Sequence, residues 1–363
     1  MGAHPSAPSG LERAGVRTTL DTVIAADPVG ELGATCAARF GGRLPFLLKV
    51  LAAEKALSIQ VHPSREQAQA GFLAETERGL APGDKTRNYV DDWPKPEILC
   101  AITPFEVLAG MRAAADAATL LGALGVGELE PLVAELAAAA RPEALTWALT
   151  RILTWPVGNR AALVTTVTAA CARLAAENGP YAAACAATVR VAGDHPGDLG
   201  VVASLLLRHA ILRPGQAVFL PADGLHAYLH GTGVELMANS DNVVRAGLTG
   251  KHVDVPELLK LTDPGVAVPV IEPRALDAGV SVYDSPAPEF RLYRAEIGPG
   301  EITLPGDGAR FVLCLDGAVA LRGAGGSALK AARGEACFLS AADGAVTASG
   351  PAVIFLATCG LNR

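Results

Sequence analysis

The sequence predicts a mainly β protein with two related β-barrels, the first of which is interrupted by a helical insertion. Short apolar runs separated by glycine and proline occupy both ends of the chain, whereas residues from about 104 to 198 are rich in alanine, with leucines at helical spacing. Residues 215–220 recur in similar form as residues 334–339, and both copies continue into a turn containing Asp-Gly. Such self-similarity indicates two copies of one β architecture.

The first half of the chain contains two strand signals and a helical region. Apolar and β-branched residues predict strands at 44–50 and 57–61. In the alanine-rich region, Pro131, Pro142 and Pro156 divide the chain into several helices. We expect these helices to form a packing domain that contributes no catalytic residues.

Strand signals return from residue 205 onward. Pro214-Gly215 predicts a turn, residues 216–220 a strand, and residues 222–224 a second turn. Further along, apolar runs on either side of Asp316-Gly317 predict a β-hairpin.

Composition excludes several classes of protein. The 363 residues carry a net charge of -7 with a pI near 5.6, which argues against a nucleic-acid-binding surface. The longest apolar stretch, residues 205–220, is broken by charged side chains, so we expect no membrane span. The N-terminal residues have no pattern of a secretory signal, and the seven scattered cysteines form no CxxC pair. We therefore expect a cytoplasmic protein with reduced cysteines.

Two separate motifs indicate a metal site. Gln60 and His62 are two residues apart, so on a strand both side chains leave the same face. A carboxylate and a second imidazole would complete a ligand set for a divalent ion such as zinc, and Glu97 and His226 are the best candidates. In the register of the repeat, Ala345 stands where His226 stands, so the second barrel should hold no metal there.

Each of these residues alone would have an ordinary structural explanation. A lone histidine in a β-rich chain is usually a hydrogen-bonded or surface residue, and a glutamate beside a strand is usually solvated. The metal hypothesis depends on their occurrence together with a second polar cluster, residues 235–251, whose side chains could hold a polyhydroxylated, anionic ligand.

With these motifs in their order, the chain resembles the type I mannose-6-phosphate isomerases, also called phosphomannose isomerases, particularly the bacterial form. The matching phrases are residues 44–51, 57–63, 95–97, 108–112, 226–229 and 235–251. The resemblance implies a double-barrel jelly roll of cupin type with an inserted α-helical domain.

The resemblance also implies roles for individual residues. It implies one zinc ion per chain, held by Gln60, His62, Glu97 and His226. The family's essential arginine corresponds to Arg245. Residues implied to be catalytic are Arg245, Lys95, Glu235 and Asp241, and those implied to bind substrate are Lys49, Ser58, Tyr228 and Lys251.

The implied reaction interconverts mannose 6-phosphate and fructose 6-phosphate through a cis-enediol. Its substrate would be a phosphorylated hexose, with phosphate held by lysines. The general base stays open among Glu235, Asp241, Lys95 and a zinc-bound water. Two alternatives also stay open: another metal-dependent cupin acting on a different sugar phosphate, and a truncated, non-catalytic cupin that binds zinc and sugar phosphate.

The resemblance predicts four segments. These are 1–103, the first part of the catalytic barrel; 104–200, the helical insertion; 201–263, the second part of that barrel; and 264–363, a metal-free C-terminal barrel. The resemblance implies a few tens of residues before the position of Met1, including strands and a pocket glutamate, so we expect the N-terminal strands of the first barrel to be missing. A monomer is favoured.

Overall fold

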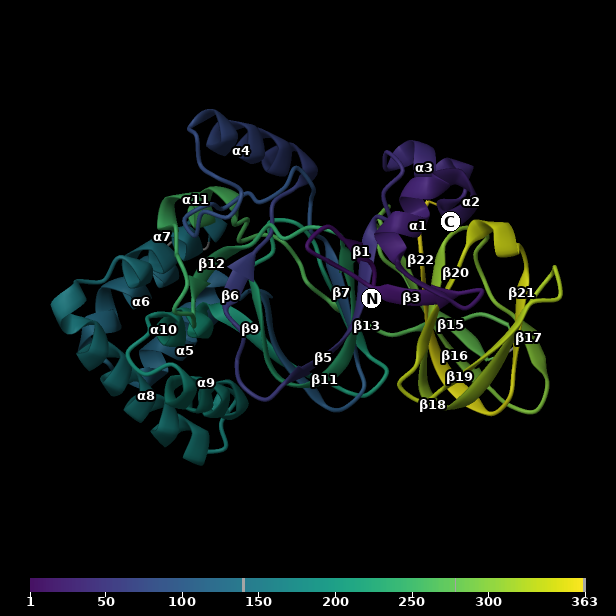
Figure 1. The fold of residues 1–363 in the computed structure, drawn as a ribbon. Helices are drawn as coiled ribbons and strands as arrows, with labels where there is room; N and C mark the ends of the chain where they lie inside the picture. The colour runs from purple at the N-terminus through teal and green to yellow at the C-terminus, as the bar shows by residue number, and fades with distance from the viewer. Residues whose placement is uncertain (139–140, 278, 362–363) are drawn as a thin grey trace.

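The computed structural model describes residues 1–138, 141–277 and 279–361. Within them, two nine-stranded antiparallel sheets curl side by side, and helices lie against the outer side of the first (Figure 1). The predicted fold class, a mainly β double barrel of cupin type with an inserted helical domain, is confirmed.

The two sheets follow one another along the chain. The first contains β5 (Phe46–Ala53), β6 (Ile59–Val61), β7 (Glu97–Ala101), β8 (Phe105–Met111), β9 (Leu207–Leu212), β10 (Ala217–Leu220), β11 (His226–Ala238), β12 (Val244–Gly247) and β13 (Val270–Ile271). The second contains β14 (Arg274–Ala275), β15 (Val280–Tyr283), β16 (Arg291–Ile297), β17 (Glu301–Thr303), β18 (Arg310–Gly323), β19 (Ala328–Ala332), β20 (Ala336–Leu339), β21 (Val346–Ser349) and β22 (Ala352–Thr358).

Strand β11 organises the first barrel because it pairs with four other strands. Its beginning pairs with β6 and β8, and its later part pairs with β5 and β7. Between these parts, Gly231 has a φ of +126°, and a Cβ there would lie 2.7 Å from a backbone oxygen of the facing loop. At the beginning of β11, His226 lies directly opposite Gln60 on β6.

The predicted internal repeat is confirmed as a structural repeat. Residues 215–220 and 334–339 each consist of a turn followed by a four-residue strand, β10 in the first barrel and β20 in the second. Gly215 and Gly334, which open the two copies, have nearly equal φ values of +89° and +85°. Both therefore adopt the left-handed conformation that glycine tolerates.

The repeat also aligns two charged residues inside the barrels. The last residue of β10, Leu220, pairs with Glu97 on β7, and the last residue of β20, Leu339, pairs with Arg310 on β18. Arg310 is fully buried, and its guanidinium donates to two backbone carbonyl oxygens at 2.7 and 3.0 Å. A buried cation in the second barrel thus takes the position of a carboxylate in the first.

The predicted hairpin around Asp316-Gly317 is wrong. Residues 310–323 form one continuous strand, β18, which pairs with β22 as far as this dipeptide and with β19 and β21 beyond it. The register shifts between Cys314 and Asp316, and Gly317 has a φ of +71°. Here Gly317 is the left-handed residue of a β-bulge. Asp-Gly is also common in hairpin turns, so the dipeptide alone does not distinguish a bulge from a hairpin.

The inserted helices cover the side of the first barrel that lies away from the second (Figure 1). They are α5 (Ala114–Leu124), α6 (Glu130–Ala138), α7 (Pro142–Leu153), α8 (Arg160–Ala176), α9 (Ala182–Asp194) and α10 (Gly200–Ala203). Pro131 and Pro142 lie in the first turns of α6 and α7, where a missing N–H costs nothing. Buried leucines of these helices, such as Leu149, share one core with Val61 and Leu225 of the barrel.

The helical insertion begins later than residue 104. Residues 105–111 form β8, a strand of the first barrel, and not part of the helical region. All seven residues of β8 are buried, so the sequence lacks the alternation that would separate a strand from a buried helix. The division into four domains otherwise stays a prediction. No helix among the described residues has both the length and the apolar character needed to cross a membrane.

The first 45 residues contain helices that the sequence analysis did not predict. Two small hairpins, β1 (Ala3–His4) with β2 (Ala7–Pro8) and β3 (Gly10–Arg13) with β4 (Val16–Thr19), precede α1 (Leu20–Ala26), α2 (Pro28–Leu32) and α3 (Ala34–Arg39). Their apolar side chains, including Leu20 and Phe40, join a core with Phe46 of the first barrel and Phe311 of the second. This segment therefore packs against both barrels where they meet (Figure 1). Two further helices are α4 (Arg65–Glu77), which lies against Tyr89 of the loop before β7, and α11 (Val255–Leu261), which contacts β12.

The bulge in β18 gives a test of the fold. Gly317→Ala should lower the melting temperature, because left-handed strain costs about 1–2 kcal/mol and the new Cβ would also lie 2.1 Å from the Pro351 oxygen. Gly326→Ala is the matched control, since Gly326 has a φ of +83° and open space around it. Thermal unfolding should show a larger loss for Gly317→Ala; equal losses would contradict the close approach.

Candidate metal centre

The residues predicted to bind metal lie on three strands that meet inside the first barrel. His62 directly follows β6, Glu97 begins β7 and His226 begins β11. Gln60 and Arg245 pair with each other across β6 and β12, and Gln60 also pairs with His226. Directly opposed residues share one face of a sheet, so these side chains project from the same face.

His62, Glu97 and His226 form a compact cluster. Their candidate ligand atoms all lie within 4.8 Å of one another, and all three side chains are buried. Nε2 of His62 lies 3.2 Å from Glu97 Oε1, and Nε2 of His226 lies 3.7 Å from Glu97 Oε2. Two imidazoles and a carboxylate are a donor set found in catalytic zinc sites.

Both imidazoles are held through their other ring nitrogen. Nδ1 of His62 donates to the carbonyl oxygen of Asn242 at 2.7 Å, and Nδ1 of His226 donates to that of Gly224 at 2.9 Å. Because a carbonyl oxygen only accepts, Nδ1 carries the proton in each neutral ring and Nε2 presents a lone pair to the cluster. Among the described residues, Nε2 of His62 is buried without a hydrogen-bond partner. The donors therefore fit a bound cation.

The charge states also suit metal binding. Burial, assisted by the neighbouring charge of Lys95, lowers the pKa of His62 to about 4, so this imidazole is neutral at physiological pH. Burial opposes ionisation of Glu97, but Lys95 and then His62 hold the pKa of this carboxyl well below its usual range. Neutral imidazole and ionised carboxylate are the ligand forms that metals require.

Gln60 reaches the same centre. Its amide nitrogen lies 3.3 Å from Nε2 of His226. The two ends of an amide have nearly the same size, so a half-turn of this group brings its oxygen to the cluster. An amide oxygen beside two imidazoles and a carboxylate makes four protein donors for one ion.

Lys95 and Tyr228 contact the Glu97 carboxylate from outside the cluster. Lys95 Nζ lies 3.2 Å from Glu97 Oε1, and the Tyr228 hydroxyl lies 3.4 Å from Glu97 Oε2. Burial and the charges of Glu97 and Glu235 raise the pKa of Tyr228 well above its usual value, so it stays a hydrogen-bond donor. Both residues are buried beside the metal cluster.

Glu235 and Lys49 form a second charged pair further along β11. They are directly opposed on β11 and β5, with Lys49 Nζ 3.5 Å from Glu235 Oε2 and 2.9 Å from the sulfur of Met237. Burial, together with the charge of Glu97, raises the pKa of Glu235, and Lys49 partly counters this shift. A buried carboxyl with a raised pKa is suited to proton transfer near neutral pH.

Arg245 and Ser58 complete the face that carries Gln60. Ser58 lies two residues before Gln60, with its hydroxyl 3.5 Å from the Gln60 amide oxygen. Among the described residues, the Arg245 guanidinium has no hydrogen-bond or ion-pair partner, and partial burial lowers its pKa. Arginine nevertheless stays charged, so this cation is free to bind an anionic group.

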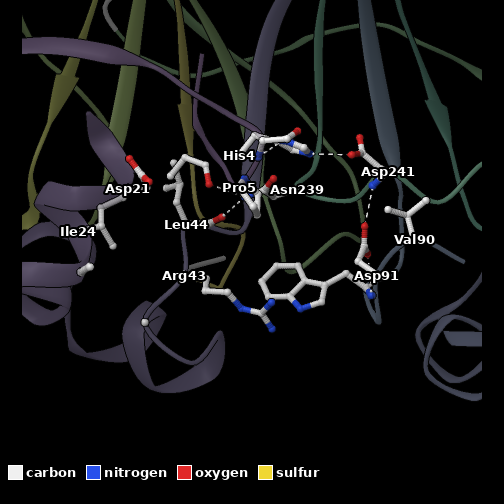
Figure 2. Close-up of a pocket in the computed structure, with 15 residues that line it drawn as sticks. His4, Pro5, Asp21, Ile24, Arg43, Leu44, Val90, Asp91, Asn239 and Asp241 are labelled. Atoms are coloured by element: carbon white, nitrogen blue, oxygen red, sulfur yellow. Dashed lines mark hydrogen bonds and ion pairs between the residues drawn. The ribbon is translucent and has the colours of Figure 1, made fainter. Parts of the chain in front are cut away.

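Two predicted site residues lie elsewhere. The Asp241 carboxylate is half-exposed and forms an ion pair with His4 at 3.0 Å, on a separate cavity of about 360 Å³ (Figure 2). The Lys251 side chain is exposed in the loop after β12. Their predicted roles at the site stay predictions, because neither side chain contacts the metal cluster among the described residues.

The sequence analysis did not single out the residues that orient the imidazoles. Asn242 and Gly224 act through backbone carbonyl groups, which every residue possesses. The only sequence signal was position, since Asn242 lies within residues 235–251 and Gly224 lies in the turn before His226.

The fold and the site define a two-barrel, cupin-type protein with a metal centre in its first barrel. Residues 1–114 match the family described as phosphomannose isomerase type I, catalytic domain. Mannose-6-phosphate isomerase from Escherichia coli K12 is 34% identical over 360 residues, covering 96% of this chain and 88% of that protein. The enzyme of that name from Bos taurus is 36% identical over 341 residues, covering 88% and 77%.

Solved structures agree. A variant of phosphomannose isomerase from Salmonella typhimurium superposes with a TM-score of 0.90 at 30% identity, covering 99% of this chain and 90% of that one. A zinc-bound mannose 6-phosphate isomerase gives a TM-score of 0.89 with the same identity and coverage. The chain belongs to the type I mannose-6-phosphate isomerase family, which confirms the resemblance found in the sequence.

The cluster predicts which variants lose metal. His62→Ala and His226→Ala should each reduce bound zinc well below one ion per chain after dialysis, because each removes one of few protein donors. His209→Ala is a matched control, since His209 is also largely buried but pairs with Glu106 at 2.6 Å. Elemental analysis measures the zinc content; full zinc in either ligand variant would contradict the assignment.

Proposed function

We propose that this protein is a zinc-dependent aldose–ketose isomerase that interconverts mannose 6-phosphate and fructose 6-phosphate through a cis-enediol. The observation that carries the proposal is the buried His62, Glu97 and His226 cluster, whose imidazole Nε2 atoms face a carboxylate. Relatives named mannose-6-phosphate isomerase, one of them solved with zinc, support this choice of substrate and metal.

The reaction moves a proton between two neighbouring carbons of the open-chain sugar. Removal of the proton beside a carbonyl group leaves negative charge on the enediolate oxygens, and this charge must be stabilised. When bound, zinc supplies a fixed positive charge for that purpose without needing a proton of its own. Gln60, His62, Glu97 and His226 would hold it.

The remaining charged side chains near the metal cluster suit a sugar phosphate. Arg245, with no partner among the described residues, would stabilise the enediolate because its guanidinium stays ionised. Lys49 and Lys95, compact cations beside Glu235 and Glu97, would bind phosphate or sugar oxygens, with Ser58 and Tyr228 as hydroxyl donors. Lys251 would add a further cation from its loop.

Glu235 is the proposed proton carrier. Its carboxyl is buried, its pKa is raised, and it lies near Lys49 and Tyr228. Such a group can take a proton from one carbon and return it to the next. Lys95 would assist as a second catalytic group. Asp241 is the weaker candidate for the base, because its carboxylate pairs with His4.

The protein would work as a monomer in the cytoplasm, without nucleic acid or membrane as a partner. The net charge of -7 argues against nucleic acid as a partner, and the free state of the described cysteines suits the cytoplasm. A dimer mass in analytical ultracentrifugation would contradict the monomer.

Arg245→Ala should lower kcat by about 10²–10³-fold, the usual cost of removing one group that stabilises an enediolate-like charge. Zinc content should stay normal, because Arg245 is not among the ligands. Arg213→Ala is the control, since Arg213 is exposed and pairs with Glu272 at 3.0 Å. Coupled assays of fructose 6-phosphate formation measure kcat; near-normal turnover in Arg245→Ala would refute the role.

Treatment with a chelator should abolish isomerisation, and added zinc should restore it, since the donors are present without the ion. The same assay, run on dialysed protein with zinc or magnesium added back, measures the effect. Magnesium should not restore activity, because it binds imidazole poorly. Activity that is indifferent to chelation would reject the metal-dependent reaction.

A further inference from the structure

We propose that Asn242 is a positioning residue that holds His62 in the orientation and tautomer required for metal binding. This rests on the proposed function, in which His62 is a ligand. Among the described residues, no hydrogen bond joins Asn242 to Gln60, Glu97 or His226. It acts through its carbonyl oxygen, which accepts from His62 Nδ1 at 2.7 Å in a fully buried environment.

The Asn242 side chain fixes the position of that carbonyl group. Its amide oxygen accepts from the backbone N–H of Val90 at 2.7 Å and of Asp91 at 3.2 Å. Its amide nitrogen donates to the carbonyl oxygens of Asp91 and Trp93, both at 2.8 Å. Every hydrogen-bonding position of the amide is thus directed at the backbone of the loop before β7.

Asp91 and Ser240 extend this network around Asn242. The Asp91 carboxylate accepts from the Asp241 N–H at 2.8 Å (Figure 2) and from the Ser240 hydroxyl at 2.8 Å. The Ser240 hydroxyl in turn accepts from the Asn242 N–H at 3.2 Å. The turn that carries Asn242 is therefore bound to the loop of residues 90–93 by the Asn242 side chain and also by Ser240 and the Asp241 N–H.

The consequence for His62 follows from the two nitrogens of its ring. A neutral imidazole has one N–H, and the carbonyl oxygen of Asn242 favours its location on Nδ1. If that oxygen moves away, the proton can lie on Nε2 or the ring can turn, and either change removes the lone pair from the cluster. Outer partners of this kind typically change metal affinity by about 10–100-fold.

The same network links the two imidazole ligands. The carbonyl oxygen of His62 accepts from the Asp223 N–H at 3.0 Å, in the turn whose Gly224 oxygen orients His226. A shift of the Asn242 turn would therefore reach both histidines through His62. An asparagine outside the ligand set thus sets the geometry of the donors.

The test measures metal affinity directly. Zinc Kd is determined by competition with a chelating dye for the wild type, Asn242→Ala, His62→Ala and Thr358→Val, together with the absorption spectrum of each protein loaded with Co²⁺. Thr358→Val is the matched control, because it removes one buried side-chain hydrogen bond of 3.0 Å in the second barrel. Melting temperatures of the metal-free proteins report loss of stability separately.

Asn242→Ala should raise the zinc Kd by about 10–100-fold and change the Co²⁺ spectrum, as expected for loss of an outer partner. Thr358→Val should lower the melting temperature and leave both metal readouts unchanged. If Asn242→Ala loses stability but keeps the wild-type Kd and spectrum, Asn242 is only structural and the proposal is wrong.

A second variant covers the case in which Asn242→Ala does not fold. Ser240→Ala removes one hydrogen bond to the Asn242 backbone, so it should raise the zinc Kd in the same direction by a smaller factor. An unchanged Kd would again overturn the proposal. If His62→Ala binds zinc as tightly as the wild type, the proposed ligand set itself fails, which is a distinct result.

Discussion

Inside the first barrel, three hydrogen-bond acceptors face one another where little water can reach them. Nε2 of His62, the Glu97 carboxylate and Nε2 of His226 repel each other, and burial makes that repulsion costly; Lys95 Nζ, 3.2 Å from Glu97 Oε1, relieves it only from outside the cluster. Neither imidazole can relieve it by turning away, because its Nδ1 proton is bound to a backbone carbonyl oxygen. The backbone thus orients both imidazole lone pairs toward the proposed ion site.

The barrel supplies this arrangement through strand register. His226 opposes Gln60, and Glu235 opposes Lys49, so the long strand β11 carries both the metal cluster and the second charged pair. Ligands on paired strands keep their separation better than ligands on loops. The helices and the loop of residues 90–93 pack around this frame, and the loop fixes Asn242 beside it. The geometry of the proposed site therefore depends on paired strands and a few buried polar contacts.

Some parts of this structure could be predicted from the sequence, and others could not. The period-two spacing of Gln60 and His62 and the repeated strand phrase have strong local signals, and both correspond to strands in the structure. The Asp316-Gly317 bulge and the strand β8 were misread, because partner strands decide these structures and local sequence does not. Asn242 escaped notice because it acts through a backbone oxygen. The half-exposed position of Asp241 depends on a contact with His4, far away in the chain.

The equivalence of Glu97 and Arg310 gives the two barrels different requirements. In the first barrel the carboxylate lies beside Lys95 and two imidazoles at the proposed ion site. In the second barrel a guanidinium at the equivalent place donates to two carbonyl oxygens, while its buried Nε has no hydrogen-bond partner among the described residues. The two barrels therefore carry opposite charges at equivalent positions. The first would balance its charge with a bound ion, and the second carries its cation as a side chain. If zinc were scarce in the cell, the first barrel would lose its bound ion, whereas the second barrel would be unchanged because it needs none.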